Sequence, residues 1–463
     1  MILRTCNRRE FMKAAGGAGA LAGAAYGQRR QRPNILFLLT DDQRWDALGC
    51  MGNSILRTPH IDRLAVQGMR FKNHFVTTAI CMSSRASILT GLYSRSHGIN
   101  DFRTPLSDAQ FAASYPALLR QAGYRTGFVG KWGVGKPLPR DRFDFFEGFP
   151  GQGHYFQERD GKPVHLTQIM GENAERFLRG CSREQPFCLS VSFKAPHVQD
   201  EDPRQFLYDP AYEELYQDVN IPAPETADNR YFRALPEFLQ NSESRRRWEI
   251  RFSTPEKYQQ SVKGYYRLIY GVDVVVGRLM RVLRELGFEQ NTIVIFTSDN
   301  GFYLGEHGLA GKWFMHEESI RTPLIVYDSR APQPLRGMAR NEMTLNIDLA
   351  STMLDYAGVD IPSSIQGRSL LPLLGGERPA WRQEFFYEHR FQHRLIPQSE
   401  GIRTQDGWKY VRYVDREPVY EELYDLREDP REVANLAKDS QHRKILDVLR
   451  ARWEAWRLRL GLA

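Results

Sequence analysis

Acidic side chains follow two separate apolar segments of the sequence. Asp41 and Asp42 come directly after the apolar run at 35–39, and Asp299 and Asn300 end a second segment of the same build, NTIVIFTSDNG. Short continuous apolar runs are typical of strands buried on both faces. Either acidic motif alone is typical of a helix cap or a turn. Because carboxylate and amide oxygens select Ca²⁺ or Mg²⁺ over zinc, the two motifs together predict a divalent-cation site.

Basic and imidazole side chains follow two further apolar runs. Lys131 ends the segment GYRTGFVGK, and Lys194 and His197 end PFCLSVSFKAPH. Helical patterns lie between these runs, the clearest at 265–286, and strands alternating with helices predict an α/β fold with a mainly parallel sheet. In such a sheet the carboxyl ends of the strands face one crevice, where ligands bind. We therefore expect the acidic, basic and imidazole groups to meet at one edge.

Cys81 opens the segment CMSSRASILTG, which has the pattern of a helix. The residue alone is compatible with a buried small side chain or with a thiol nucleophile. A helix N-terminus suits an anion, and Arg85, one turn further on, is placed to hold an oxyanion. A thiolate is a poor soft ligand beside a hard dication. A cysteine hydrolase would need a base and an oxyanion hole, so an unmodified cysteine leaves the acidic residues unexplained.

The segment CMSSRASILTG resembles the signature of the type I sulfatases, members of the alkaline phosphatase superfamily in which this cysteine is oxidised to formylglycine. Nearly the whole mature chain resembles the same family, and it resembles the bacterial glycan sulfatases within that family. The further matching segments, in order, are NILFLLTDDQRWDALGC, TPHIDRLAVQGMRF, GYRTGFVGKW, APH, TSDNGFYLGEHG, GKWFMHEESIRTPLIVY, NIDLASTMLDYAGV, IQGRSLLPLL, GWKYVRY and ELYDLREDPREVANLA. The resemblance implies an alkaline-phosphatase-like sandwich: a large, mainly parallel central sheet flanked by helices, with a smaller C-terminal α+β subdomain containing an antiparallel sheet.

The resemblance also assigns roles to individual residues. It implies that the hydrated aldehyde made from Cys81 is the nucleophile that attacks sulfur. The implied ligands of the metal, Ca²⁺ or alternatively Mg²⁺, are Asp41, Asp42, Asp299, Asn300 and the oxygen of modified Cys81. Arg85 would hold formylglycine, and Lys131 and Lys312 would neutralise sulfate oxygens. His197 would protonate the departing alcohol.

Two positions depart from the family pattern. Ser83 stands where the signature commonly has proline or alanine, which leaves open which maturation system acts on Cys81. Gly133 stands in GKWG where the family usually has the histidine that deprotonates the second hydroxyl of the hydrate. Replacements for this histidine that the sequence offers are His97, His154 and His316.

Two basic segments outside these motifs admit a functional or a structural interpretation. The segment FFYEHRFQHR contains His389, Arg390 and His393, which are suited to stack on a sugar or pair with a second anionic group. A packed strand with a basic edge explains the same pattern. The segment SRRRWEIR, at 244–251, is predicted to be a solvated loop or helix face.

The N-terminus has the pattern of an export signal. Arg8 and Arg9 precede an Ala/Gly-rich apolar run that is too short to span a bilayer, which predicts a twin-arginine signal at 1–27 and the twin-arginine translocase as a partner. A disordered basic tail is the alternative. The mature protein is then expected to be exported, periplasmic or extracellular, without stable membrane insertion.

The composition and the positions of the cysteines limit the remaining possibilities for function and domain organisation. The chain has 463 residues, 26% of them charged, and a net charge of +7, and no segment resembles a nucleic-acid-binding module. We expect a catalytic domain at 33–375 and the C-terminal subdomain at 376–463. Cys181 and Cys188 can pair only if the compartment is oxidising.

The resemblance therefore implies a hydrolase that removes sulfate from a sulfated carbohydrate, glycosaminoglycan-like or otherwise derived from a polysaccharide. Its expected partners are a sulfated saccharide and a formylglycine-generating maturation enzyme. Alternatives within the superfamily are a phosphonate monoester or phosphodiester hydrolase and an arylsulfatase. An alternative of another class, suggested by Gly133, is a non-catalytic protein that binds sulfated glycans.

Overall fold

The strands at the centre of the structure are buried on both faces. The computed structural model describes residues 32–461. Every residue of strand β1 (Asn34–Asp41) is buried, as is every residue of β8 (Thr292–Ser298). Alternate side chains of β1 belong to different cores: Phe37 packs in one apolar cluster and Leu36 in the other. The strand thus separates two layers, as its continuous apolar run predicts.

One nine-stranded sheet organises the molecule. Its strands lie in the order β12-β2-β11-β8-β1-β7-β3-β4, and β13 pairs with β2. Only β11 runs antiparallel to its neighbours in this sheet, so the sheet is mainly parallel, as predicted. The remaining strands of the sheet are β2 (Met69–Phe75), β3 (Arg125–Lys131), β4 (Phe145–Phe149), β7 (Phe187–Pro196), β11 (Arg321–Asp328), β12 (Met338–Arg340) and β13 (Thr344–Leu345).

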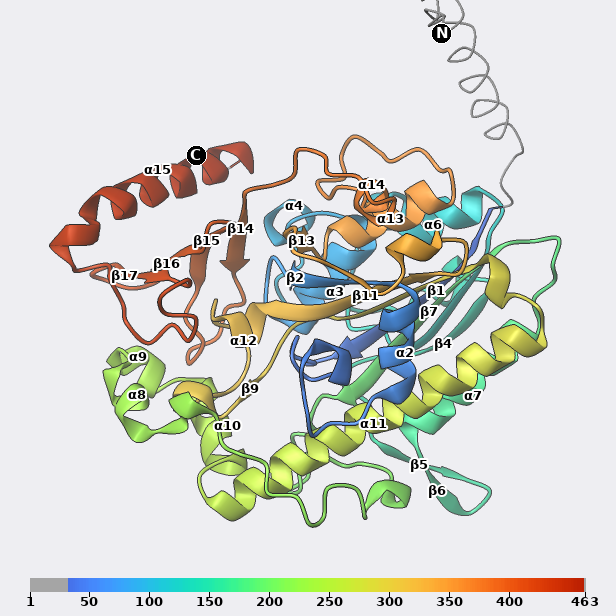
Figure 1. The fold of residues 1–463 in the computed structure, drawn as a ribbon, viewed down its shortest axis with the longest axis horizontal. Helices are drawn as coiled ribbons and strands as arrows, with labels where there is room; N and C mark the ends of the chain where they lie inside the picture. Colours follow the sequence, from blue (N-terminus) through green and yellow to red (C-terminus); the bar gives the residue numbers. More distant parts are fainter. Residues whose placement is uncertain (1–31, 462–463) are drawn as a thin grey trace, which may run out of the picture. The chain divides into compact units, whose positions relative to one another are not determined.

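Helices cover both faces of this sheet (Figure 1). On one face lie α2 (Pro59–Gln67), α7 (Leu166–Arg179) and α11 (Pro255–Glu285), and on the other α3 (Cys81–Thr90), α6 (Tyr115–Gln121) and α13 (Asp348–Tyr356). The helix predicted at 265–286 is confirmed as part of α11, which starts ten residues earlier. Thr254 accepts a hydrogen bond from the backbone of Lys257 and Pro255 occupies the first position, a strong N-terminal signal.

A second, four-stranded antiparallel sheet follows, as predicted, in the order β14-β15-β16-β17 (Figure 1). Arg95, which precedes this second sheet in the chain, forms ion pairs with its residues Glu388 and Glu400. All three side chains are at most 9% exposed, so these buried ion pairs join the second sheet to the rest of the molecule. Tyr387 adds a hydrogen bond from its hydroxyl to the carbonyl of Trp313, at 2.6 Å. The elements are β14 (Glu384–His389), β15 (Ser399–Thr404), β16 (Trp408–Tyr413), β17 (Tyr420–Asp425) and helix α15 (Arg443–Arg459).

Shorter elements fill the connections. They are the helices α4 (Ser94–His97), α5 (Asp108–Ala112), α8 (Asn229–Ala234), α9 (Glu237–Gln240), α10 (Glu243–Arg251), α12 (Glu317–Ile320) and α14 (Leu371–Leu374), and the paired strands β5 (Phe156–Arg159), β6 (Lys162–His165), β9 (Tyr303–Leu304) and β10 (Ala310–Gly311). Across residues 32–461, no helix combines the length and the apolar character that crossing a bilayer requires.

Three further predictions concern a cysteine pair, the export signal and the domain boundary. Cys181 and Cys188 are both free thiols. The predicted export signal at 1–27 lies outside the described residues. The chain from Pro33 onward forms one compact unit, and its division at residue 375 stays a prediction.

Candidate active site

The ends of four parallel strands meet at one edge of the large sheet. Asp41 ends β1, Lys131 ends β3, and Asp299 follows β8 directly. His197 follows β7, whose last residue is Pro196. Because β1 pairs in parallel with β7 and β8, and β7 with β3, these carboxyl ends face the same way. The expected convergence of the strand ends is confirmed.

Asp41 is the most heavily compensated of the acidic groups. Its carboxylate is fully buried and forms ion pairs with Lys131 and with Arg85, the latter at 3.2 Å. Burial alone raises the pKa of Asp41, but the positive charges of Lys131 and Arg85 outweigh this and hold the pKa well below its usual range. These cations therefore favour the ionised form of Asp41.

Arg85 ties three strands together beneath the site. Its Nε donates to Oδ2 of Asp299 at 2.8 Å, and its Nη1 donates to the carbonyl of Lys131 at 2.9 Å. Burial, followed by the nearby charge of Asp41, raises the pKa of Asp299 to about 6 despite the opposing charge of Arg85. The charge of Arg85 therefore does not fully offset the burial of Asp299, and a further cation nearby would lower the pKa of this carboxylate.

Asp42 faces a different set of partners. Lys312 forms an ion pair with Oδ1 of Asp42, and Asn300 donates to the same oxygen at 2.6 Å. Burial raises the pKa of Asp42 although Lys312 opposes the rise. The backbone of Asp42 is left-handed, with a φ of 66°, a conformation that Asp tolerates better than most residues and that is concentrated at functional sites.

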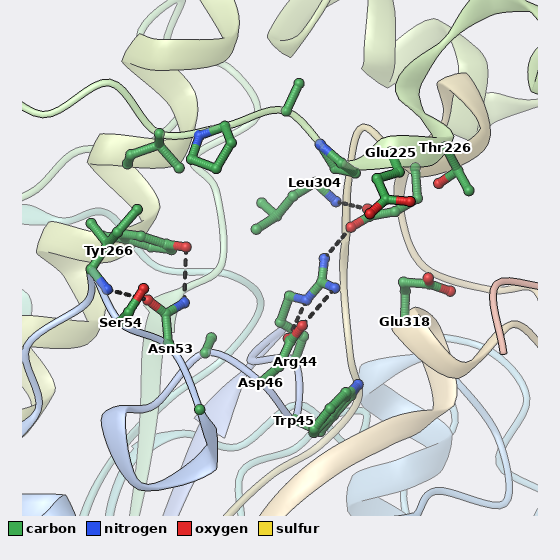
Figure 2. Close-up of a pocket in the computed structure, with 18 of the residues that line it drawn as sticks. Arg44, Trp45, Asp46, Asn53, Ser54, Glu225, Thr226, Tyr266, Leu304 and Glu318 are labelled. Carbon is green, nitrogen blue, oxygen red and sulfur yellow. Dashed lines mark hydrogen bonds and ion pairs between the residues drawn. The ribbon is translucent and has the colours of Figure 1, made fainter.

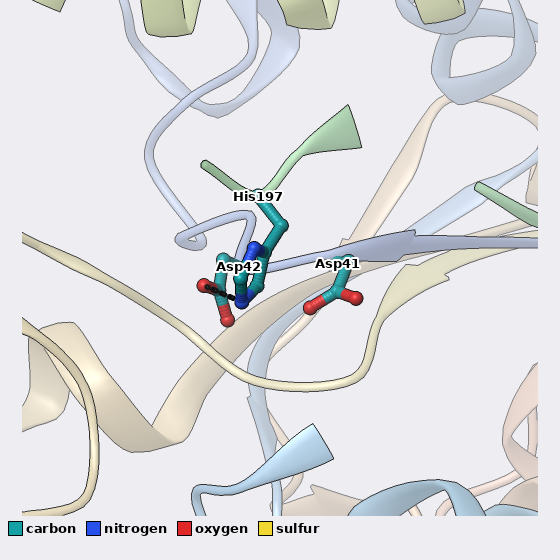
Figure 3. Close-up of side chains that lie close together, drawn as sticks. All are labelled: Asp41, Asp42 and His197. Atoms are coloured by element: carbon teal, nitrogen blue, oxygen red, sulfur yellow. Dashed lines mark ion pairs between the residues drawn. The ribbon is translucent and has the colours of Figure 1, made fainter. Parts of the chain in front are cut away.

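His197 lies beside both aspartates, as Figure 3 shows. Its Nε2 is 3.5 Å from Oδ2 of Asp42, and its Nδ1 is 2.7 Å from the carbonyl of Val198. A carbonyl only accepts, so Nδ1 carries the proton and Nε2 is the nitrogen that faces the site. Burial lowers the pKa of His197 well below its ordinary value, which keeps the ring neutral.

The donor set fits a hard divalent cation. Two buried oxygens, Oδ1 of Asp41 and Oδ1 of Asn300, have no hydrogen-bond partner among the described residues. Ligand atoms of Asp41, Asp42 and His197 also lie within 4.8 Å of one another. Orphaned buried oxygens at a carboxylate cluster are what a cation would satisfy. The geometry adds His197 to the potential ligands, a role that the sequence did not suggest.

Cys81 heads a helix that is buried along its whole length. Every residue of α3 is buried, and Cys81 itself is 1% exposed. The hydroxyl of the unusual Ser83 donates a hydrogen bond to the carbonyl of Ile99 at 2.5 Å. Serine is therefore accommodated by a hydrogen bond that neither proline nor alanine would make.

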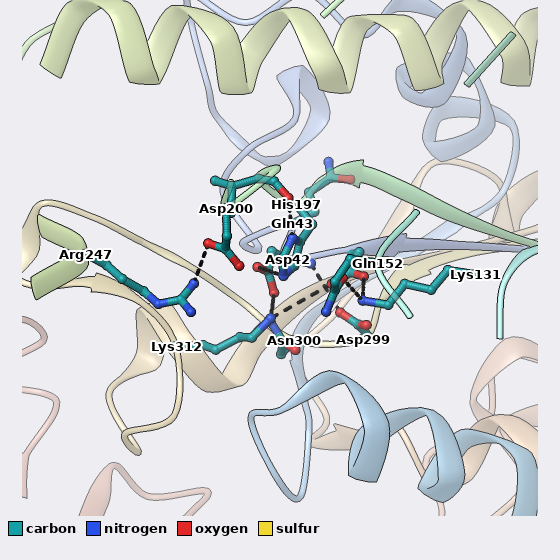
Figure 4. Close-up of polar contacts among 12 residues, drawn as sticks. Asp42, Gln43, Lys131, Gln152, His197, Asp200, Arg247, Asp299, Asn300 and Lys312 are labelled. Carbon is teal, nitrogen blue, oxygen red and sulfur yellow. Dashed lines mark hydrogen bonds and ion pairs between the residues drawn. The ribbon is translucent and has the colours of Figure 1, made fainter. Parts of the chain in front are cut away.

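A pocket of about 210 Å³ opens over Cys81. Catalytic candidates on its wall are Cys81, His197 and Lys312, and Figure 4 shows the polar contacts among the residues around it. Of the three predicted sugar-contacting residues, His393 lines this pocket, while His389 and Arg390 do not. The other lining residues are Ile80, Phe102, Gln152, Asp200, Glu243, Arg247, Trp313, Phe391 and Ile396.

The position of His389 explains why it does not reach the pocket. It is the last residue of β14 and is fully buried, and both ring nitrogens lack a hydrogen-bond partner among the described residues. Burial lowers its pKa to about 3, so the ring is neutral. His389 is placed as a packing residue of the second sheet.

Gly133 leaves no room for a side chain. Its φ is +75°, and a Cβ built on it would lie 2.6 Å from Cδ of Arg85. The shaft of Arg85 therefore occupies the space that a histidine at this position would enter.

The three histidines considered as replacements lie elsewhere, and none lines the described pocket over Cys81. His97 is buried between Ser87 and the backbone of Ile99. His316 is buried with its Nδ1 bonded to the hydroxyl of Tyr303. His154 is exposed and lies 3.5 Å from a carboxylate oxygen of Glu201.

Gln152 is a pocket residue that the sequence analysis missed. Its side-chain oxygen accepts a hydrogen bond from Nζ of Lys131 at 2.6 Å, and it lines the pocket over Cys81 (Figure 4). It stands in the loop between β4 and β5, in the sequence GQG, where neither periodicity nor a motif marks it.

The prediction that 244–251 forms a solvated face is wrong for two of its arginines. The segment is helix α10, and Arg247 lines the pocket over Cys81. Arg251 is 1% exposed and pairs with Asp200 at 2.8 Å. A short, arginine-rich helix carries little apolar periodicity, so its buried side was invisible in the sequence.

A larger cavity, of about 530 Å³, contains none of the predicted catalytic residues. Its polar groups largely satisfy one another: Arg44 pairs with Asp46 and Glu306, and Asn53 donates to the hydroxyl of Tyr266 (Figure 2).

Two family models and several known proteins match this chain. The family model described as sulfatase matches residues 33–359, and the model described as the C-terminal part of N-sulphoglucosamine sulphohydrolase matches residues 305–459. The N-acetylglucosamine-6-O-sulfatase of Bacteroides thetaiotaomicron is 32% identical over 92% of this chain and 86% of its own length. Human N-sulphoglucosamine sulphohydrolase is 28% identical over 92% of this chain and 90% of its own length.

Solved structures also match nearly the whole chain. The structure of BT4656 in complex with its substrate D-glucosamine-2-N,6-O-disulfate has a TM-score of 0.82 and 30% identity, and covers 93% of this chain and 98% of that one. The phosphonate monoester hydrolase of Agrobacterium radiobacter has a TM-score of 0.75 at 23% identity, covering 93% and 96%, and shows a shared fold.

The packing of Arg85 against Gly133 predicts an unequal effect of two glycine substitutions. Gly133→Ala should lower the free energy of unfolding by roughly 3–5 kcal/mol, because it displaces Arg85 from two buried carboxylates. Gly98 has nearly the same φ, +74°, with no atom near a built Cβ. Gly98→Ala should cost only the backbone strain, about 1–2 kcal/mol. Urea unfolding measures both, and equal losses would contradict the proposed role of Arg85.

Proposed function

The chain belongs to the sulfatase family, and from this membership and the site we propose that it removes sulfate from a sulfated carbohydrate, with Cys81 in its formylglycine form. One observation carries the proposal. The buried helix that begins at Cys81 also carries Arg85, which binds Asp41 and Asp299 at the strand ends. The nucleophile position and the acidic cluster are thereby fixed to one another.

The proposed substrate class is a saccharide with a sulfated glucosamine. This rests on two comparisons: a curated relative is named N-acetylglucosamine-6-O-sulfatase, and a similar solved structure holds a glucosamine disulfate as its substrate. A 6-O-sulfate on a glucosamine-type sugar is therefore the first substrate to test. A simple aryl sulfate and a phosphodiester are the competing substrates within the superfamily.

The residues of this chain divide the work between two sides of the sulfate group. Formylglycine would supply an oxygen nucleophile, and a Ca²⁺ or Mg²⁺ held by Asp41, Asp42, Asp299 and Asn300 would supply positive charge to the sulfate oxygens. Lys131 and Lys312 are buried cations in this cluster and would bind sulfate oxygens directly.

His197 would act on the leaving-group side. Because Nδ1 donates to the carbonyl of Val198, Nε2 is the nitrogen that would take up a proton beside the bound, anionic sulfate ester and pass it to the departing alcohol. Gln152 would orient Lys131 through its hydrogen bond. In the absence of a histidine at position 133, the return of formylglycine to its aldehyde form would depend on one of the other groups in this pocket.

Modification and replacement of Cys81 test the proposal. Protein produced with a maturation enzyme should show a Cys81 peptide whose mass reflects loss of sulfur and two hydrogens and gain of one oxygen. Cys81→Ala should abolish sulfate release from N-acetylglucosamine-6-sulfate, and Cys50→Ala, which removes a thiol outside the pocket, should not. Faster turnover of a matching phosphodiester would favour the phosphodiesterase alternative, and glycan binding without sulfate release by the modified protein would favour a non-catalytic one.

Cation binding can be measured without activity. We expect Ca²⁺ to stabilise the wild-type protein against thermal unfolding, by about 2.7 kcal/mol at a hundredfold excess over its Kd. Asp299→Asn should remove most of this stabilisation, whereas Asp108→Asn, at a carboxylate that is 90% exposed, should keep it. A chelator should reverse the effect. Equal stabilisation of all three proteins by Ca²⁺ would place the cation elsewhere.

We also propose that the N-terminal segment directs export by the twin-arginine route, which carries folded proteins. Replacement of Arg8 and Arg9 by lysines should then retain active enzyme inside the cell. The matched control is the same change at Arg29 and Arg30, a second arginine pair beyond the predicted signal. Fractionation and sulfatase assay of each compartment measure the effect, and unchanged export of the Arg8/Arg9 variant would refute the proposal.

A further inference from the structure

The outer wall of the pocket over Cys81 carries a set of charged residues that the catalytic steps do not use. Arg247 donates through Nη1 to Asp200 at 2.9 Å and through Nε to Glu243 at 3.0 Å. All three residues line the pocket together with His197 and Lys312. Figure 4 shows Arg247 and Asp200 on the side of the cluster where Lys312 and His197 also lie.

This wall is held rigidly from behind. Arg251, which is 1% exposed, pairs with the same oxygen of Asp200 at 2.8 Å and donates to Gln205 at 2.9 Å. Arg247 also lies over the ring of Trp313, 5.2 Å from its centre. Arg247 and Asp200 are thus fixed before any ligand arrives, which is the condition for precise recognition.

Trp313 is itself constrained. Its φ is 93°, a conformation that a bulky residue rarely adopts, and its carbonyl accepts the hydrogen bond from Tyr387 of the second sheet. Strain of this kind is retained where the surrounding structure fixes a functional geometry. Trp313 directly follows Lys312 in the chain, and its ring contacts Arg247, so one residue links the outer wall to a proposed catalytic lysine.

The size and lining of the pocket suit one sugar ring. Its volume of about 210 Å³ is below the range usual for drug-sized ligands. Phe102 and Phe391 meet edge to face with ring centres 5.5 Å apart, and the ring of Phe391 is stacked on that of His393. Aromatic rings on one side and a polar wall on the other are the usual elements of a binding site for a ring with an apolar face and polar edges.

The charge of the wall decides which polar groups it accepts. Two guanidinium groups and two carboxylates balance one another, so the wall presents donors and acceptors without an excess of positive charge. Hydroxyl and amide groups both donate and accept and are matched by such a set. A second sulfate on the same ring would lie against Asp200 and Glu243 while Arg247 is already neutralised.

We propose that Arg247, Asp200 and Glu243 bind the neutral polar groups of the sugar that carries the scissile sulfate, and select against a second anionic group on that ring. This rests on the proposed sulfatase function and names its specificity. The proposal predicts that the substrate preference of this chain differs from that of the structural relative whose substrate is a glucosamine disulfate. It also replaces the expectation that basic residues near the pocket recruit a second anion.

Three substrates test the proposal: N-acetylglucosamine-6-sulfate, glucosamine-2-N,6-O-disulfate and 4-methylumbelliferyl sulfate, which has no sugar hydroxyls. Wild-type enzyme should have a kcat/KM at least tenfold higher for the monosulfated than for the disulfated sugar. Arg247→Ala should lower kcat/KM for the monosulfated sugar about 10- to 100-fold, the effect of losing hydrogen bonds from a charged donor, and leave the aryl sulfate nearly unchanged.

Two further variants complete the series. Glu243→Gln removes a negative charge at nearly constant shape, so it should reduce the preference against the disulfated sugar about tenfold. Arg246→Ala is the matched control, because Arg246 is an exposed arginine on the same helix and does not line the pocket. It should behave as wild type with all three substrates.

Binding keeps the proposal testable if hydrolysis of sugars is not observed. Calorimetric titration of Cys81→Ala with the same two sugars should show the same order of affinity and the same loss in Arg247→Ala. A wild-type preference for the disulfated sugar, or an equal loss with aryl sulfate in Arg247→Ala, would overturn the proposed selectivity while leaving the sulfatase function intact. Absence of both sulfate release and sugar binding would overturn the proposed selectivity and the proposed sulfatase function together.

Discussion

The structure depends on balancing three carboxylates that are buried at one edge of a parallel sheet. Asp41, Asp42 and Asp299 lie at adjacent strand ends, and their mutual repulsion in a region without water is costly unless cations compensate it. Arg85 and two lysines supply that compensation from other elements. The charge balance therefore connects β1, β3 and β8 to α3 and to the segment at Lys312, and it makes the site a part of the core.

Arg85 also fixes the position of Cys81, the proposed nucleophile. Residues four apart lie on the same side of a helix, so an arginine anchored in the carboxylate cluster holds Cys81 at the mouth of that cluster. The same anchoring explains the neighbouring sequence. Gly133 is small because the shaft of Arg85 passes where its Cβ would be, and Ser83 is tolerated because its hydroxyl bonds to Ile99. The two departures from the family pattern thus have separate local causes.

The sequence predicted the parts that follow simple rules. Apolar runs marked the buried strands, the polar residues after them marked the common edge, and alternation marked the second sheet. It did not reveal Gln152 or Asp200, because loop residues have no periodicity and their neighbours are set by the tertiary fold. It also failed to separate His389 from His393: they are four residues apart, but one ends a buried strand and the other follows it at the pocket.

The two halves of the pocket are controlled by different parts of the chain. The catalytic half is built from strand ends of the central sheet, where a shift of one residue would reverse every side chain and break the charge balance. The outer half is built from α10 and the loop after β7, where ion pairs of Arg247 and Arg251 with Asp200 and the contact of Arg247 with Trp313 hold the arrangement. Substitutions in the outer half can therefore change which sugar is accepted without disturbing the carboxylate cluster.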